Sequence, residues 1–134
     1  VFVQLENEWI KAGRRDGTTV TAALVHPKQG LLTVANVGDS RAVLDTGCSI
    51  LGLTNDHRIN NSKSEFKRLK NAGCTLAQLA MDLQGPTRTD SEVGVGPMRM
   101  WPGGLCVSRS IGDIDCGPEV LPIPHVKQVM LPAR

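Results

Sequence analysis

Aromatic side chains are scarce in this 134-residue sequence, and there is little net charge of either sign. Aromatic residues make up 3% of the chain, tyrosine is absent, and the formal net charge is +2. A nucleic-acid-binding protein usually carries a stronger basic stripe with aromatic residues beside it. The densest basic cluster here is short, consisting of Lys63, Lys67, Arg68 and Lys70. The composition therefore argues against nucleic acid as a partner.

The sequence also lacks cysteine spacing typical of metal sites, and it lacks long apolar runs. The four cysteines form no C-x-x-C pair and no cluster of zinc-ligand spacing with the three histidines, so we expect buried free thiols. No segment approaches the ~20 apolar residues that a membrane span needs, and the first residues lack a charged-then-apolar signal pattern. These absences predict an intracellular protein, cytoplasmic or nuclear, without a membrane span.

The length of the chain and its 40% hydrophobic content are sufficient for one domain with a core. Both ends look cut, however. Val1 begins inside an apolar periodic stretch without an initiating methionine, and Arg134 ends where a strand or turn should continue. We therefore expect residues 1–134 to be the central fragment of one larger domain.

Two segments have the spacing of amphipathic helices. Residues 1–11 place apolar side chains at helical intervals, namely Phe2, Leu5, Trp9 and Ile10. In the second segment, Ser62 and Glu65 form a capping box, and Gly73 marks the end of the helix. We predict a helix at each place.

The rest of the pattern is that of short strands joined by turns. Six strands are predicted, over residues 18–26, 31–37, 41–44, 49–54, 105–108 and 125–131. The first two should form a hairpin, and Gly38 should bend the chain after them. Residues 74–104 contain several glycines and prolines, so we expect an irregular excursion over the surface. Hairpins without β-α-β repeats predict an α+β fold with antiparallel sheets.

Three polar corners stand out against their apolar flanks. Each is rich in Gly, Asp, Ser or Arg, and together they suggest one shared site: residues 37–43, 53–58 and 104–113. Carboxylates at strand ends are the ligands that Mg²⁺ and Mn²⁺ prefer. By spacing alone, the aspartates at 16, 39, 56, 113 and 115 could bind metal, form ion pairs with nearby arginines, or cap turns.

In this order and spacing the corners resemble the middle of a metal-dependent serine/threonine protein phosphatase of the PPM (2C) family. Residues 16–20 and 96–113 add further matches, so the resemblance covers nearly the whole chain from Asp16 onward. It implies part of an α/β/β/α sandwich, in which two antiparallel sheets are flanked by helices. It also implies that residues 75–104 form the flap beside the cleft.

The activity that this resemblance implies is hydrolysis of phosphoserine or phosphothreonine in phosphoprotein substrates. Water activated by two Mn²⁺ or Mg²⁺ ions would carry it out in the full-length protein, and a regulatory protein partner is compatible with it. One alternative is a catalytically silent scaffold or regulatory module with the same fold. Another is a small β-rich binding domain unrelated to phosphatases.

The family's main metal ligands lie in D-G-H-G-G, D-G-x-W-D and final D-N segments, none of which occurs in this sequence. We therefore assign no catalytic residue here and expect the segment alone to be inactive. Asp16 is our one candidate for a metal ligand. It lies near the position at which the family has an acidic ligand for a weakly held third metal ion.

The remaining candidates are expected to support the site. We predict a buried ion pair between Asp39 and Arg41 at the strand bend, with structural support favoured over metal ligation. Asp56 and His57 should brace a loop beneath the excursion. Arg109 and Asp113 have two alternative roles, which the sequence does not separate. They either support the packing or shape the metal cleft.

Three flap residues are candidates for substrate contact, namely Arg88, Arg99 and Trp101. The alternatives are that Trp101 packs under the flap and that both arginines are solvated, although an arginine fork suits phosphate well.

Overall fold

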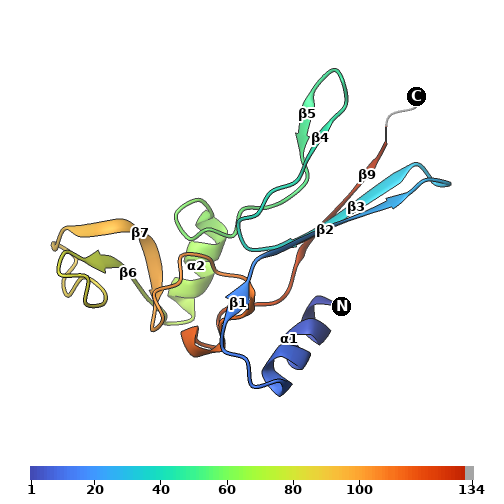
Figure 1. Ribbon diagram of the computed structural model, residues 1–134. Helices are drawn as coiled ribbons and strands as arrows, with labels where there is room; N and C mark the ends of the chain where they lie inside the picture. Colours follow the sequence, from blue (N-terminus) through green and yellow to red (C-terminus); the bar gives the residue numbers. More distant parts are fainter. Residues whose placement is uncertain (132–134) are drawn as a thin grey trace.

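The computed structural model describes residues 1–131, and Figure 1 shows how their helices and strands are arranged. The two helices are α1 (Phe2–Lys11) and α2 (Lys63–Asn71), and a 3₁₀ turn spans Ile114–Cys116. The strands are β1 (Gly17–Thr18), β2 (Val20–His26), β3 (Leu31–Val37), β4 (Val43–Asp45), β5 (Ile50–Gly52), β6 (Thr75–Ala80), β7 (Gly94–Trp101), β8 (Ile111–Gly112) and β9 (His125–Met130). The prediction of an α+β fold with antiparallel pairing is confirmed.

The largest sheet has the order β2-β3-β9, and its strands run side by side in Figure 1. The predicted hairpin is confirmed, since β2 pairs with β3 from Val20 opposite Val37 to His26 opposite Leu31. The predicted last strand is confirmed as well, because β9 pairs antiparallel with the other edge of β3. Strands far apart in sequence therefore meet on the central strand β3.

One face of this sheet is covered and the other is open. Leu32 and Val34 of β3 are buried with Leu53, against side chains of the small β4–β5 hairpin. On the opposite face, Leu24 is 59% exposed and Met130 is 68% exposed. The expected packing of two sheets face to face in the larger domain stays a prediction.

The predicted helix α2 is confirmed, and its boundaries follow from its sequence. The hydroxyl of Ser62 accepts a hydrogen bond from the Glu65 amide at 3.4 Å, and Gly73 follows the helix with a φ of +81°. Leu69 is fully buried in a second core, which also contains Ile59, Met100 and Val120. This core joins α2 to strand β7 and to the segments around them.

The expectation of an irregular excursion over residues 74–104 is wrong, because most of its two arms pair as β6 and β7 (Figure 1). One of the glycines behind that expectation is Gly94, and the strand pairing requires glycine at this position. A Cβ placed on Gly94 would lie 2.4 Å from the Cβ of Gln78, so only glycine allows the two arms to approach this closely. A bulge between Ala77 and Leu79 absorbs the remaining irregularity.

The predicted strand over residues 105–108 is also wrong. This segment divides its hydrogen bonds between different neighbours, with single bridges from Leu105 to Met100 and from Val107 to Arg58. A continuous ladder with one partner is therefore absent there, and the nearest strand is β8, which pairs with β1.

Of the predicted buried thiols, Cys48 is exposed, while the cysteines at 74, 106 and 116 are partly buried; all four are free.

Candidate functional site

The three polar corners meet at His57. The amide of Gly38 donates to the His57 Nδ1 at 3.1 Å, and the His57 amide donates back to the Gly38 carbonyl at 3.2 Å. On the other side, the amide and the hydroxyl of Ser108 donate to the His57 carbonyl at 2.9 and 3.0 Å. The corner that contains His57 therefore bonds to both of the others.

The centre of the site is the carboxylate of Glu65, which is 5% exposed. Arg109 reaches both of its oxygens, with Nη2 to Oε1 at 2.6 Å and Nε to Oε2 at 3.2 Å. Arg68 donates to Oε2 through Nη2 at 3.0 Å and Nε at 3.2 Å, and the Ser108 hydroxyl donates to the same oxygen at 2.7 Å. Two arginines and a serine therefore satisfy one buried carboxylate.

These contacts determine the protonation state of Glu65. Burial by itself would raise the pKa of this carboxyl group, but the hydrogen bonds from Arg109, Ser108 and Arg68 outweigh it and lower the pKa to about 2. Glu65 is therefore ionised throughout the physiological range. The predicted capping box accounts for the backbone amide of Glu65, which donates to Ser62, whereas the Glu65 carboxylate bonds to Arg68, Ser108 and Arg109. Its i, i+4 spacing to Leu69 was the signal that Glu65 lies on the buried face of α2.

The same two arginines also bind main-chain carbonyls. Arg68 donates to the carbonyls of Ser108 and Glu119 at 3.1 and 2.9 Å, and Arg109 donates to that of Ile123 at 2.9 Å. The cluster therefore ties α2 to the chain between residues 108 and 123, which connects β7 to β9. The structure places Arg109 inside this cluster.

The predicted ion pair between Asp39 and Arg41 is wrong. Asp39 pairs instead with Arg58 at 3.3 Å, and Arg41 pairs with Asp56 at 2.9 Å. Both partners lie in the next corner, which the contacts between Gly38 and His57 hold against the bend. Neither pair is buried, since the Arg41 side chain is 68% exposed and that of Asp39 is 30% exposed.

Asp56 holds the loop that leads into α2. Its carboxylate accepts from the Arg58 amide at 2.9 Å, from the Asn61 side chain at 2.7 Å, and from Arg41. Burial raises the pKa of Asp56, but these hydrogen bonds outweigh it, so the pKa is lowered. The carboxylate is thus committed to a structural network with Arg41, Arg58 and Asn61.

His57 is 3% exposed, and its tautomer follows from its neighbour. Because Nδ1 accepts the Gly38 amide, the proton of the neutral ring lies on Nε2. Burial is the main cause that lowers the pKa of His57, and the positive charge of Arg109 adds to it. The ring is therefore neutral near pH 7.

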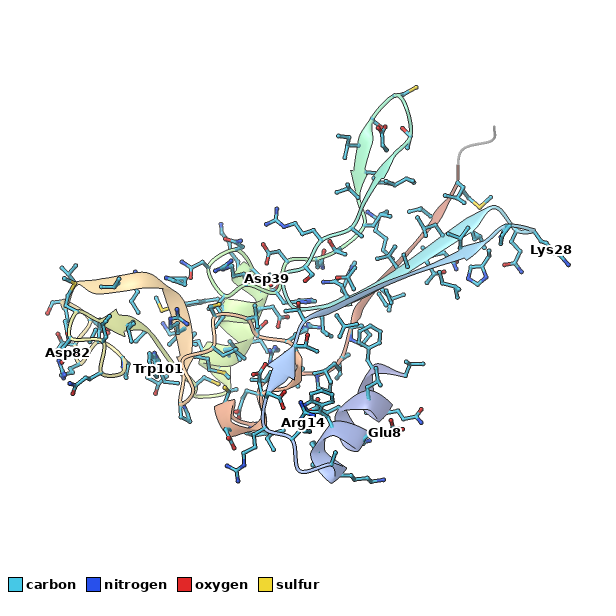
Figure 2. The ribbon with its side chains drawn as sticks, viewed as in Figure 1. Glu8, Arg14, Lys28, Asp39, Asp82 and Trp101 are labelled. Carbon is cyan, nitrogen blue, oxygen red and sulfur yellow. The ribbon has the colours of Figure 1, made fainter. Side chains whose placement is uncertain are left out.

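Asp16 and Asp113 lie side by side across the β1–β8 pair. The Asp113 amide donates to the Asp16 carbonyl at 3.4 Å, and the Asp113 carboxylate lies where a side chain on Gly17 would be. The carboxylate of Asp16 is already bound by Arg14 at 2.8 and 3.0 Å, and this hydrogen bonding lowers its pKa. Figure 2 shows Arg14 between α1 and this pair of strands.

Metal binding would require several donors at one place. Residues 1–131 contain no group of three or more His, Cys, Asp or Glu side chains that could hold a metal ion. The side chains that the structure describes therefore do not form a metal centre by themselves.

The flap candidates lie at opposite ends of the β6–β7 hairpin. Near its tip, Arg88 pairs with Asp82 and Glu92. At its base, Arg99 donates to the Gly104 carbonyl at 2.7 Å, and the Trp101 indole donates to the Ala77 carbonyl at 3.1 Å. Figure 2 shows Asp82 at the tip and Trp101 near α2.

Comparison with solved structures defines the class of fold. The chain superimposes on a sex-determining protein of C. elegans with a TM-score of 0.75 and 22% identity, over 98% of this chain and 28% of that chain. A phosphatase from Toxoplasma gondii matches with a TM-score of 0.63 and 15% identity, over 95% of this chain and 47% of that one. At these identities the likeness shows the fold alone.

Sequence comparison identifies the family. The sequence profile of the family described as "Protein phosphatase 2C" matches residues 5–133. Two curated relatives are "Probable protein phosphatase 2C 5" of Arabidopsis thaliana and "Probable protein phosphatase 2C 15" of Oryza sativa subsp. japonica, each 44% identical over 98% and 97% of this chain. The chain belongs to the protein phosphatase 2C family, and it spans 28% and 27% of the length of these two relatives.

Proposed function

We propose that this chain acts as part of a metal-dependent protein serine/threonine phosphatase. The observation that supports the proposal most directly is the family match over residues 5–133, which includes all three polar corners. The full-length protein of this proposal is a polypeptide that carries this chain and has the length of the curated relatives. Its reaction would be hydrolysis of phosphoserine or phosphothreonine by metal-activated water.

Mn²⁺ or Mg²⁺ is the ion that we propose, because carboxylate-rich phosphatase centres favour hard divalent cations. Phosphoproteins would be the substrates, and a regulatory protein partner remains part of the proposal. We also propose an intracellular location. No helix within residues 1–131 is long and apolar enough to cross a membrane.

For this chain we propose a positioning role. The cluster of Glu65, Arg68, Arg109 and Ser108 links α2 to the connection between β7 and β9, and His57 links that connection to the bend after β3. Such a network can hold strand ends and loops in fixed relative positions, which a reaction centre requires.

Among the flap candidates, we propose substrate contact for Arg88 at the hairpin tip. Its side chain is 62% exposed even though it pairs with Asp82 and Glu92, whereas Arg99 and Trp101 are hydrogen-bonded to main-chain carbonyls at the hairpin base. An exposed guanidinium can bind a phosphate or a carboxylate on a substrate protein. Hydrolysis of a small aryl phosphate would not use this contact.

The test is an assay of the purified full-length protein with para-nitrophenyl phosphate and a phosphoserine peptide, in the presence of manganese or magnesium. Turnover that chelation abolishes and added metal restores would support the phosphatase. A folded protein that binds no divalent metal and hydrolyses neither substrate would instead support the silent scaffold. The Arg88→Ala variant should lose activity on the peptide while retaining activity on the aryl phosphate.

A further inference from the structure

A polar pocket of about 640 Å³ lies at the N-terminal end of α2. It is formed by residues 55–57, 61–65, 109 and 124–126, so it lies beside the Glu65 cluster. The nine-residue helix directs its first turn into this pocket. The N-terminal end of a helix carries unpaired amide groups and the positive end of the helix dipole.

Two backbone amides are free at this position. Ser62 bonds to the Glu65 amide through its side chain and to the Phe66 amide through its carbonyl. Within residues 1–131, the amides of Lys63 and Ser64 donate to no protein acceptor. Both residues line the pocket, and the Ser64 hydroxyl adds a third polar group there.

The buried ring of His57 is the independent observation that points to a ligand. Its Nδ1 is occupied by the Gly38 amide, so Nε2 carries the proton. This N–H group has no acceptor among the described residues, although the side chain is 3% exposed and lines the pocket. The Nε2–H group can therefore donate only to water or to a ligand in the pocket. The Nδ1 of His125, which also lines the pocket, is buried and has no hydrogen-bond partner among the described residues.

Lys63 is a cation at the pocket that has no carboxylate partner among the described residues. The pocket's two carboxylates, on Asp56 and Glu65, are already paired with three arginines, at positions 41, 68 and 109. Of these three arginines only Arg109 lines the pocket, and Lys63, the other lining cation, forms no ion pair among the described residues. An anion would therefore pair with Lys63 and accept hydrogen bonds from the free donors.

We propose that this pocket is a noncatalytic binding site for a phosphate group. The amides of Lys63 and Ser64, the Ser64 hydroxyl, the Lys63 ammonium and the His57 Nε2–H provide more donors than the two oxygens of a carboxylate can readily use. The phosphate can come from free inorganic phosphate or from a second phosphoserine of a substrate. The second of these sources, a phosphoserine of a substrate, rests on the proposed phosphatase function, and the first does not.

The direct test is equilibrium dialysis of the EDTA-treated full-length protein against labelled inorganic phosphate, since chelation removes any phosphate held by metal. Replacing Ser64 with aspartate places a competing carboxylate in the first turn, where it favours the helix. The S64D variant should bind about one phosphate fewer per molecule without a lower melting temperature. Equal phosphate binding by the wild type and S64D would overturn the site.

A matched pair of lysine variants tests the specific contact. Lys63 and Lys67 are both exposed on α2, but only Lys63 lines the pocket. K63Q should weaken phosphate binding about five- to tenfold, the effect of losing one charge-assisted contact, and K67Q should change it less than about twofold. Equal losses in the two variants would indicate a diffuse charge effect and would also overturn the proposal.

Steady-state kinetics with manganese distinguish the two sources. If the phosphate belongs to a substrate, S64D raises the KM for a doubly phosphorylated peptide and leaves that for a singly phosphorylated peptide unchanged. If it is free phosphate, both KM values stay unchanged and only the response to added phosphate is altered. Failure of the full-length protein to hydrolyse para-nitrophenyl phosphate would count against the proposed function, while the dialysis result still decides the pocket.

Discussion

Replacing Glu65 with glutamine tests whether the buried carboxylate cluster holds this part of the fold together. Glutamine preserves the shape of the side chain but removes the charge that Arg68 and Arg109 share at 2.6 to 3.2 Å. Breaking a buried pair by removing one partner costs about 3–5 kcal/mol, because the remaining charge is left unpaired. The lowered pKa, from 4.5 to about 2, corresponds to about 3 kcal/mol by linkage, which agrees with that range.

The pH dependence gives this prediction its sign. A carboxyl group whose pKa is lower in the folded state stabilises the fold above its unfolded pKa and loses this contribution as the pH falls. For Glu65 the loss should occur between about pH 4.5 and pH 2. The difference in unfolding free energy between wild type and E65Q should therefore be largest near pH 7 and should shrink across this window.

Urea unfolding of the full-length protein from pH 2 to pH 7 measures the effect. Glu8 provides a matched control, because its side chain lies on α1 (Figure 2) and, among residues 1–131, its carboxylate accepts one hydrogen bond, from the side-chain amide of Gln4. The E8Q variant should change the unfolding free energy by less than about 0.5 kcal/mol. The reasoning fails if E65Q is as stable as E8Q, or if its deficit does not change with pH.

Three further predictions concern other parts of the chain. The 134-residue chain alone should show no manganese-dependent hydrolysis of para-nitrophenyl phosphate; clear turnover would contradict the assignment of the main metal ligands to other segments. Asp39→Ala should cost only about 0–1 kcal/mol in thermal unfolding, because its pair with Arg58 is partly exposed, and a loss above about 2 kcal/mol would contradict this. Trp101→Phe should cost about 0.5–1.5 kcal/mol by removing the hydrogen bond to Ala77, and unchanged stability would show that this bond contributes nothing.

Local sequence patterns were sufficient to predict those helices and strands whose ends are determined by residues close by in the sequence. The helix α2 has its cap at Ser62 and its stop at Gly73, and the β2–β3 hairpin has a turn between two β-branched runs. The family resemblance also follows from order and spacing along the chain, and the profile match over residues 5–133 confirms it. These features are encoded by neighbours in sequence, so they can be interpreted without coordinates.

Contacts between distant residues were decided only by the tertiary structure. Asp39 lies two positions from Arg41, yet its partner is Arg58, because the Gly38–His57 bonds bring a second loop against the bend. Likewise, Gly94 suggested a break but permits a close strand pair, since its effect depends on what faces it. Glu65 became the centre of the site only when residues 40 or more positions away reached it. Spacing along the chain cannot specify such partners, because the free energy of an ion pair depends on burial and geometry that many segments create together.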